Sequence, residues 1–176
     1  MSNERNVHGG WLSVLITCVV ICVVGCGTNK FEQEVTIEDS SVKFAREAMS
    51  GQYAIVSTAE VKKLRDDGAD FFLLDAMPAA TSFDLAHIPG AANFEFPKGP
   101  IDKWDEESMP GRTKEGYRQL LGDDLDRLII VYCGFVKCAR SHNAAMFARE
   151  LGYTNVKRYA GGIYAWRGAG LAVESK

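Results

Sequence analysis

The chain has 176 residues and a formal net charge of −3, which favours one domain with an appendage. This charge balance, without a basic run, is not typical of nucleic-acid binding, and we expect no nucleic-acid partner. With only three histidines and no zinc-type spacing of cysteine and histidine, we expect neither a metal nor another cofactor.

The N-terminal segment contains an almost unbroken apolar run at residues 11–24, which is short for a membrane span but suits a secretory signal. The Val-Val-Gly-Cys sequence at residues 23–26 resembles a bacterial lipobox, whose cysteine is lipidated and becomes the new N-terminus. We therefore predict a signal peptide over residues 1–25 and lipidation at Cys26. An uncleaved signal anchor is the alternative, because Arg5 is the only cation in the first ten residues.

Both alternatives place the folded part outside the cytoplasm and at a membrane. We expect an extracytoplasmic, membrane-anchored bacterial lipoprotein, in the periplasm or at the cell surface. Processing at Cys26 would remove Cys18 and Cys22 with the signal. Cys133 and Cys138 would then be the two remaining thiols, too few for a disulfide framework.

Residues 26–51 are polar and charged, and are interpreted as a tether that could hold a short helix at residues 42–49. The folded domain is predicted over residues 52–176. Its first element is a helix that starts at Ser57-Thr58-Ala59-Glu60, a sequence with capping-box spacing. Further elements are predicted in this order: a buried strand at 71–74, a strand at 93–96, a long surface loop at 97–111 and a short helix at 117–121.

The apolar, β-branched run at residues 128–132 predicts a buried parallel strand that ends directly before Cys133. A helix is predicted from Ser141 to residue 151, followed by a strand at 155–159 and a helical turn at 163–167. Strands that alternate with helices indicate a single α/β domain, with a parallel sheet and helices on both faces. Ligands bind at the carboxyl edge of such sheets, where Cys133 is expected.

The ordered motifs resemble the rhodanese domain family over about residues 56–173. The resemblance implies an α/β domain whose loop cysteine accepts a sulfane sulfur as a persulfide and passes it to a thiophilic acceptor. The motifs are Leu74-Asp75, His87-Ile88-Pro89-Gly90-Ala91, Val131-Tyr132-Cys133, Arg140-Ser141, Leu151-Gly152-Tyr153, Val156 and Gly161-Gly162-Ile163-Tyr164-Ala165-Trp166.

Two features of this sequence depart from the family pattern. Asp75-Ala76-Met77 stands where the family has Asp-Val-Arg, so an arginine is missing. The family loop has four residues between cysteine and arginine, whereas six residues separate Cys133 from Arg140. The loop also contains a second cysteine, Cys138. These departures concern the substrate and the standard activity more than the fold.

Cys133 is predicted to be the nucleophile and persulfide carrier, because loop N–H groups and a helix start favour its thiolate. An inert buried cysteine is the alternative. Arg140 is expected to add positive charge and orient an anionic donor such as thiosulfate, unless it serves a structural ion pair. Cys138 could resolve the persulfide, protect Cys133 from over-oxidation, or be a spectator. The donor would be bound by the other loop residues, which are Gly134, Phe135, Val136, Lys137 and Ala139.

Several other side chains are expected to be structural. Asp75 is interpreted as a cap at a strand end, and His87 as a histidine that bonds the backbone. His142 is expected on the surface of a helix start, although it could act as a base. Tyr164 and Trp166 are predicted to lie in the core.

The leading functional hypothesis is a thiosulfate or polysulfide sulfurtransferase, or a persulfide carrier, acting through Cys133. Its partners would be a small anionic sulfur donor, a thiol acceptor and, through the lipid anchor, a membrane. One alternative is a non-catalytic rhodanese-fold binding module or thiol redox sensor. Another is an arsenate reductase or a phosphatase-like enzyme that uses the enlarged loop.

Overall fold

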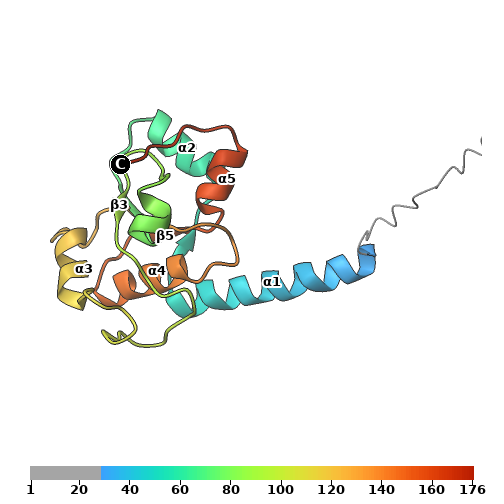
Figure 1. The fold of residues 1–176 in the computed structure, drawn as a ribbon, viewed down its shortest axis with the longest axis horizontal. Coiled ribbons are helices and arrows are strands. Elements are labelled where there is room, and N and C mark those ends of the chain that lie inside the picture. Colours follow the sequence, from blue (N-terminus) through green and yellow to red (C-terminus); the bar gives the residue numbers. More distant parts are fainter. Residues whose placement is uncertain (1–28) are drawn as a thin grey trace, which may run out of the picture.

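The computed structural model describes residues 29–176 (Figure 1). The predicted signal peptide and Cys26 lie outside the described residues, so both remain predictions. The described part is one α/β domain whose parallel strands form a sheet in the order β1-β5-β4-β2-β3. The strands are β1 (Ala54–Ile55), β2 (Phe72–Asp75), β3 (Ala92–Asn93), β4 (Ile129–Tyr132) and β5 (Val156–Tyr159).

Helices cover both faces of this sheet, as predicted, because alternate residues of the buried strands point to opposite sides. Ile129 and Val131 of β4 pack in one core cluster with α3 and α4, whereas Ile130 and Tyr132 pack in a second cluster with α2 and α5. The helices are α1 (Lys30–Gly51), α2 (Thr58–Asp66), α3 (Lys114–Leu121), α4 (Arg140–Glu150) and α5 (Gly162–Gly168), with a π-helical turn η1 (Ala79–Phe83).

Most local predictions are confirmed. Ser57 and Glu60 form the capping box that starts α2. The predicted strand at 93–96 is shorter, because only Ala92 and Asn93 pair with β2. Phe94 and Phe96 follow it into the core, where they pack against aromatic side chains of the 97–111 loop and α3.

The helix α1 is much longer than the short helix considered at residues 42–49. Its N-terminal half extends away from the domain, with Phe31 and Val35 exposed, and its C-terminal half packs against α4 (Figure 1). The last turns of α1 are therefore part of the folded domain. Within residues 29–176, no helix is both long enough and apolar enough to cross a membrane.

Candidate active site

The site is built by the loop at residues 133–139, which leaves the carboxyl end of β4 and leads into α4. Backbone hydrogen bonds from the start of α5 orient this loop. Ile163 N–H donates to the Cys133 carbonyl and Tyr164 N–H donates to the Gly134 carbonyl, each at 3.0 Å. Because the C=O and N–H of a trans peptide point in opposite directions, the Gly134 N–H points away from α5. It donates to the sulfur of Cys138.

Cys133 is completely buried, which favours the alternative of an inert buried cysteine over the predicted nucleophile. It continues the alternation of β4, so its side chain joins Ile129 and Val131 in the core. Its Sγ lies 3.1 Å from Ser141 Oγ. The hydrogen bond that its thiol gives to the Cys138 sulfur, together with burial, raises the pKa of Cys133 well above the ordinary value. A protonated and sealed thiol is not suited to attack an external donor.

Cys138 is also buried, with 8% of its surface exposed, but it lines a pocket and its surroundings favour the thiolate that the sequence analysis assigned to Cys133. The thiol of Cys133 donates a hydrogen bond to its sulfur, and the backbone N–H groups of Arg140 and Gly134 add two more. With the positive charge of Arg140, these donors outweigh burial and lower the pKa of Cys138 to about 6. Of the two loop thiols, Cys138 is therefore the one whose surroundings favour the thiolate.

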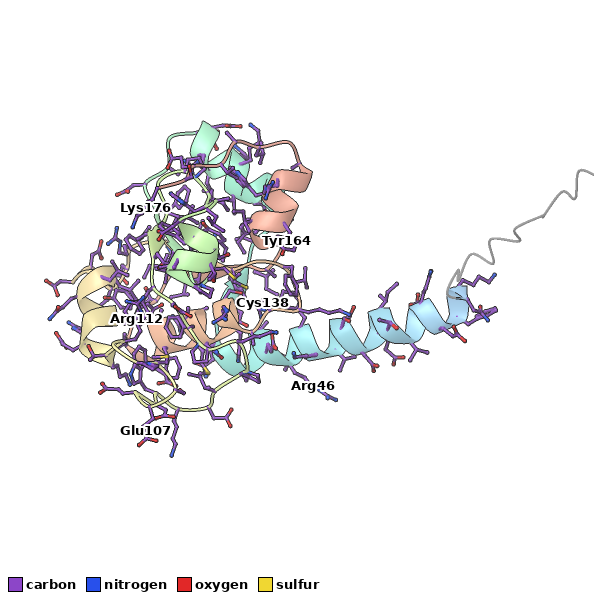
Figure 2. The ribbon with its side chains drawn as sticks, in the orientation of Figure 1. Arg46, Glu107, Arg112, Cys138, Tyr164 and Lys176 are labelled. Carbon is purple, nitrogen blue, oxygen red and sulfur yellow. The ribbon has the colours of Figure 1, made fainter. Side chains whose placement is uncertain are left out.

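A pocket of about 380 Å³ opens over Cys138. Its lining contains three cations, Lys98, Lys137 and Arg140, and no carboxylate, so it favours an anion. Cys138 lies where the loop meets α4, near Tyr164 of α5 (Figure 2). The lining residues are Met77, Pro78, Thr81, Ser82, Lys98, Phe135, Lys137, Cys138, Arg140 and Tyr164.

Tyr164 does not lie in the core as predicted. Its side chain is 64% exposed at the pocket rim, where its ring packs against Phe135 with 5.4 Å between centroids. Trp166 is buried, as predicted. The short α5 turns successive side chains to different sides, so the 163–167 pattern did not show which aromatic faces the solvent.

Arg140 makes the structural contacts that the sequence analysis considered, and it also lines the pocket. Its guanidinium donates to the Phe96 carbonyl and lies 3.9 Å from Glu95, which holds it in place. The same side chain lines the pocket, and its charge acts on Cys138. Its role in orienting a donor remains a prediction.

The other predicted loop residues do not all reach the pocket. Phe135 and Lys137 line it, and Gly134 contributes its N–H to Cys138. Val136 instead lines a groove between the loop and α1, and Ala139 is buried at the start of α4. Val136 and Ala139 therefore do not line the pocket, and their part in donor binding through loop N–H groups stays a prediction.

Arg158 of β5 donates hydrogen bonds to carbonyl oxygens of the loop. It was not identified as a residue of the site from the sequence. It is completely buried, and its cation lies over the ring of Phe44 on α1. The sequence signal was an arginine inside a predicted buried strand, where a charge requires partners. Its donors reach Ser141 Oγ at 3.0 Å, Glu47 Oε2 at 2.6 Å, Tyr53 OH at 3.1 Å, and the carbonyl oxygens of Cys138 at 3.0 Å and Val136 at 3.4 Å.

The family follows from the comparison with known proteins, in which residues 57–169 match the rhodanese-like domain model. The chain belongs to the rhodanese-like domain family. None of the curated proteins compared with it matches.

Solved structures share the fold of this rhodanese-like domain. A thiosulfate sulfurtransferase from Pseudomonas aeruginosa has a TM-score of 0.54 at 20% identity, covering 77% of this chain and 23% of that one. The rhodanese-like domain of an Anabaena protein has a TM-score of 0.50 at 22% identity, covering 69% of this chain and 79% of that one. A protein of unknown function from Rhodopseudomonas palustris, described as a possible tyrosine phosphatase, has a TM-score of 0.50 at 22% identity, with 77% and 93% covered.

Two polar residues of the rhodanese-like domain shape the pocket without touching Cys138. Asp75 caps the end of β2, since its Oδ1 accepts the Met77 N–H at 2.8 Å, and burial raises its pKa to about 6. His87 is buried and bonds the Phe83 carbonyl through Nδ1 at 2.9 Å. The structural roles predicted for both are confirmed.

His142 is not on the helix surface as expected. It is buried, and its Nδ1 lies 2.9 Å from Tyr53 OH. Burial lowers the pKa of its imidazole, which therefore stays neutral at physiological pH.

The lowered pKa of Cys138 has a measurable consequence. In the folded protein, the rate of alkylation by iodoacetamide is expected to rise with pH and reach half its maximum near pH 6, because only the thiolate reacts. Replacing Cys133 by alanine removes the first of the sulfur's donors and should move this midpoint to higher pH. Mass spectrometry of the labelled peptides measures both effects. Preferential labelling of Cys133 would contradict this assignment.

Proposed function

We propose that this rhodanese-like protein is a sulfurtransferase that carries sulfane sulfur as a persulfide on Cys138. The observation that carries the proposal is the placement of Cys138 as a thiolate beneath a pocket lined by cations. The second loop thiol, Cys133, lies behind it in the core and holds it ionised.

The chemistry follows from this arrangement. Lys98, Lys137 and Arg140 attract an anionic donor such as thiosulfate to the pocket. The Cys138 thiolate attacks the outer sulfur of the donor, and the donor S–S bond breaks with its electron pair, so that sulfite leaves. The product is a Cys138 persulfide anion within the cationic lining. A thiol acceptor then attacks the terminal sulfur and restores the Cys138 thiolate.

The position of the nucleophile bears on the phosphatase-like alternative. If Cys138 is the nucleophile, Ala139 alone separates it from Arg140, and most of the loop precedes the reacting sulfur. A large ring after the nucleophile was the feature that favoured a tetrahedral oxyanion. The order of residues in the loop therefore removes the support for the phosphatase-like alternative.

The proposed setting is extracytoplasmic, with the domain held at a membrane through a lipid on Cys26. The lipobox-like sequence at residues 23–26 supports this setting. Donor and acceptor would then be a small sulfur anion and a thiol outside the cytoplasm.

Mass spectrometry after treatment with thiosulfate tests the proposed function. The reduced protein is incubated with the donor, alkylated and digested with trypsin, which cleaves after Lys137 and so separates the two cysteines. We expect one added sulfur atom on Cys138 in the Cys133→Ser variant and none in Cys138→Ser. Added sulfur on Cys133, or on neither residue, would overturn the proposal. Circular dichroism confirms that both variants are folded.

A further inference from the structure

The two thiols of the loop have different surroundings. Cys138 lines the pocket, where a donor arrives and where the transferred sulfur would lie. Cys133 is completely buried, and its Sγ lies 3.4 Å from the carbonyl oxygen of Cys138, next to the Cys138 side chain. The Cys138 sulfur therefore lies between a solvent-facing pocket and a second thiol.

We propose that Cys133 is a resolving thiol that converts the Cys138 persulfide into a Cys133–Cys138 disulfide and releases hydrosulfide. This inference rests on the proposed function, since it needs a persulfide on Cys138. It extends that function from sulfur transfer to reduction of sulfane sulfur. The product class is an inorganic sulfide, in place of a persulfide on an acceptor.

The step balances within the residues described. Cys133 sulfur bonds to Sγ of Cys138, and the bond between Sγ and the terminal sulfur breaks with its electron pair. The proton of the Cys133 thiol passes to the departing sulfur, which leaves as HS⁻. The terminal sulfur is reduced and the two cysteine sulfurs are oxidised. An external dithiol, of the class that reduces protein disulfides, must return both cysteines to thiols.

The placement of the groups suits this displacement. Attack on a sulfur–sulfur bond is favoured along the line of that bond, from the side opposite the leaving sulfur. The core side of Cys138 is filled by Cys133, so the transferred sulfur has room on the pocket side. Hydrosulfide would then depart directly into the cation-lined pocket.

Ser141 and Arg158 can assist formation of the attacking thiolate. Arg158 Nε donates to Ser141 Oγ at 3.0 Å, which leaves the hydroxyl proton of Ser141 free to point elsewhere. Cys133 Sγ lies 3.1 Å from the same oxygen. A hydrogen bond from Ser141 therefore stabilises negative charge as it develops on the buried Cys133 sulfur.

Sulfide release in the absence of an added thiol reductant tests the inference. The reduced full chain is freed of reductant and mixed with thiosulfate, which yields sulfite on sulfur transfer, so that sulfide arises only from the resolving step. We expect wild-type protein to release up to one sulfide per chain and to lose both loop thiols to alkylation. Non-reducing peptide mapping should show the Cys133–Cys138 disulfide.

Cys133→Ser separates this inference from the proposed function. Serine keeps a hydrogen-bond donor beside Cys138 but cannot form a disulfide, so this variant should accumulate the Cys138 persulfide and release no sulfide. If the wild type holds a lasting persulfide on Cys138 and releases no sulfide, the resolving role of Cys133 is overturned and the sulfurtransferase survives. If neither protein takes up sulfur, both proposals are overturned.

Discussion

Arg158→Met is expected to lower the free energy of unfolding by about 3–5 kcal/mol, the usual cost of removing one partner of a buried ion pair. Methionine has a similar length but no donors. The substitution leaves the mostly buried Glu47 carboxylate with only the exposed Lys43 as its ion-pair partner, and it frees the Cys138 and Val136 carbonyls that Arg158 holds. Chemical denaturation followed by circular dichroism measures the loss, and the rate of Cys138 alkylation reports on the loop.

Two further variants define the origin of this effect. Arg167→Met removes an exposed arginine at the end of α5, and its effect should stay within about 0.5 kcal/mol. Glu47→Gln keeps the shape of the α1 side chain but removes its charge, so stability should fall in the same direction as in Arg158→Met. Equal stability of the Arg158→Met and Arg167→Met variants would show that the buried cation does not hold the loop and α1 together.

Gly162→Ala is expected to slow persulfide formation about 100-fold, the penalty typical of reacting groups displaced by about 1 Å. Gly162 has a φ of +58°, and a Cβ there would lie 2.0 Å from the Cys133 carbonyl oxygen. Either the loop or the start of α5 must move. The hydrogen bond from Ile163 to the Cys133 carbonyl, which turns the Gly134 N–H towards Cys138, would then be lost, together with the bond from Tyr164 to the Gly134 carbonyl. Single-turnover kinetics with thiosulfate measures this rate.

Gly170→Ala is the matched control for this substitution. Gly170 also has a positive φ, +71°, but a Cβ there would meet no atom within 4 Å. Both variants carry a backbone cost of about 1–3 kcal/mol for a left-handed alanine. Only Gly162→Ala should also impair persulfide formation and raise the midpoint pH of Cys138 alkylation. Similar kinetics in both variants would exclude the close approach of α5 to the loop as a determinant of activity.

Helix α1 is longer than predicted, and its last turns contact residues that are distant in the sequence. Residues 30–51 contain many charged and polar side chains, and the pattern alone favoured a tether with a short helix. In the structure, Glu47 pairs with buried Arg158 and Phe44 lies under the same cation, which fastens the last turns of α1 to the domain. This segment precedes the 57–169 match to the rhodanese-like family, so the family pattern contained no signal for it.

The sequence by itself determined the fold class, because local signals agreed with one another. The apolar run before Cys133, the capping box at Ser57 and Glu60, and the alternation of strands and helices all predicted a parallel sheet covered on both faces. It also located the reactive loop and its two thiols. These signals are short-range, so they can be recognised without knowing which distant residues meet.

Only the tertiary structure decided which thiol lines the pocket and which is completely buried. Cys133 directly follows β4 and continues the alternation of its side chains, so it points into the core and packs against α4. Its contact with the Cys138 side chain and its burial raise its pKa, which favours the protonated thiol. The Cys133 side chain does most to lower the pKa of Cys138, and the N–H groups of Arg140 and Gly134 lower it further; the start of α5 turns the Gly134 N–H towards Cys138 by holding the Cys133 carbonyl. Accessibility and pKa depend on partners that lie far apart in the chain, and no local pattern specifies how those partners meet.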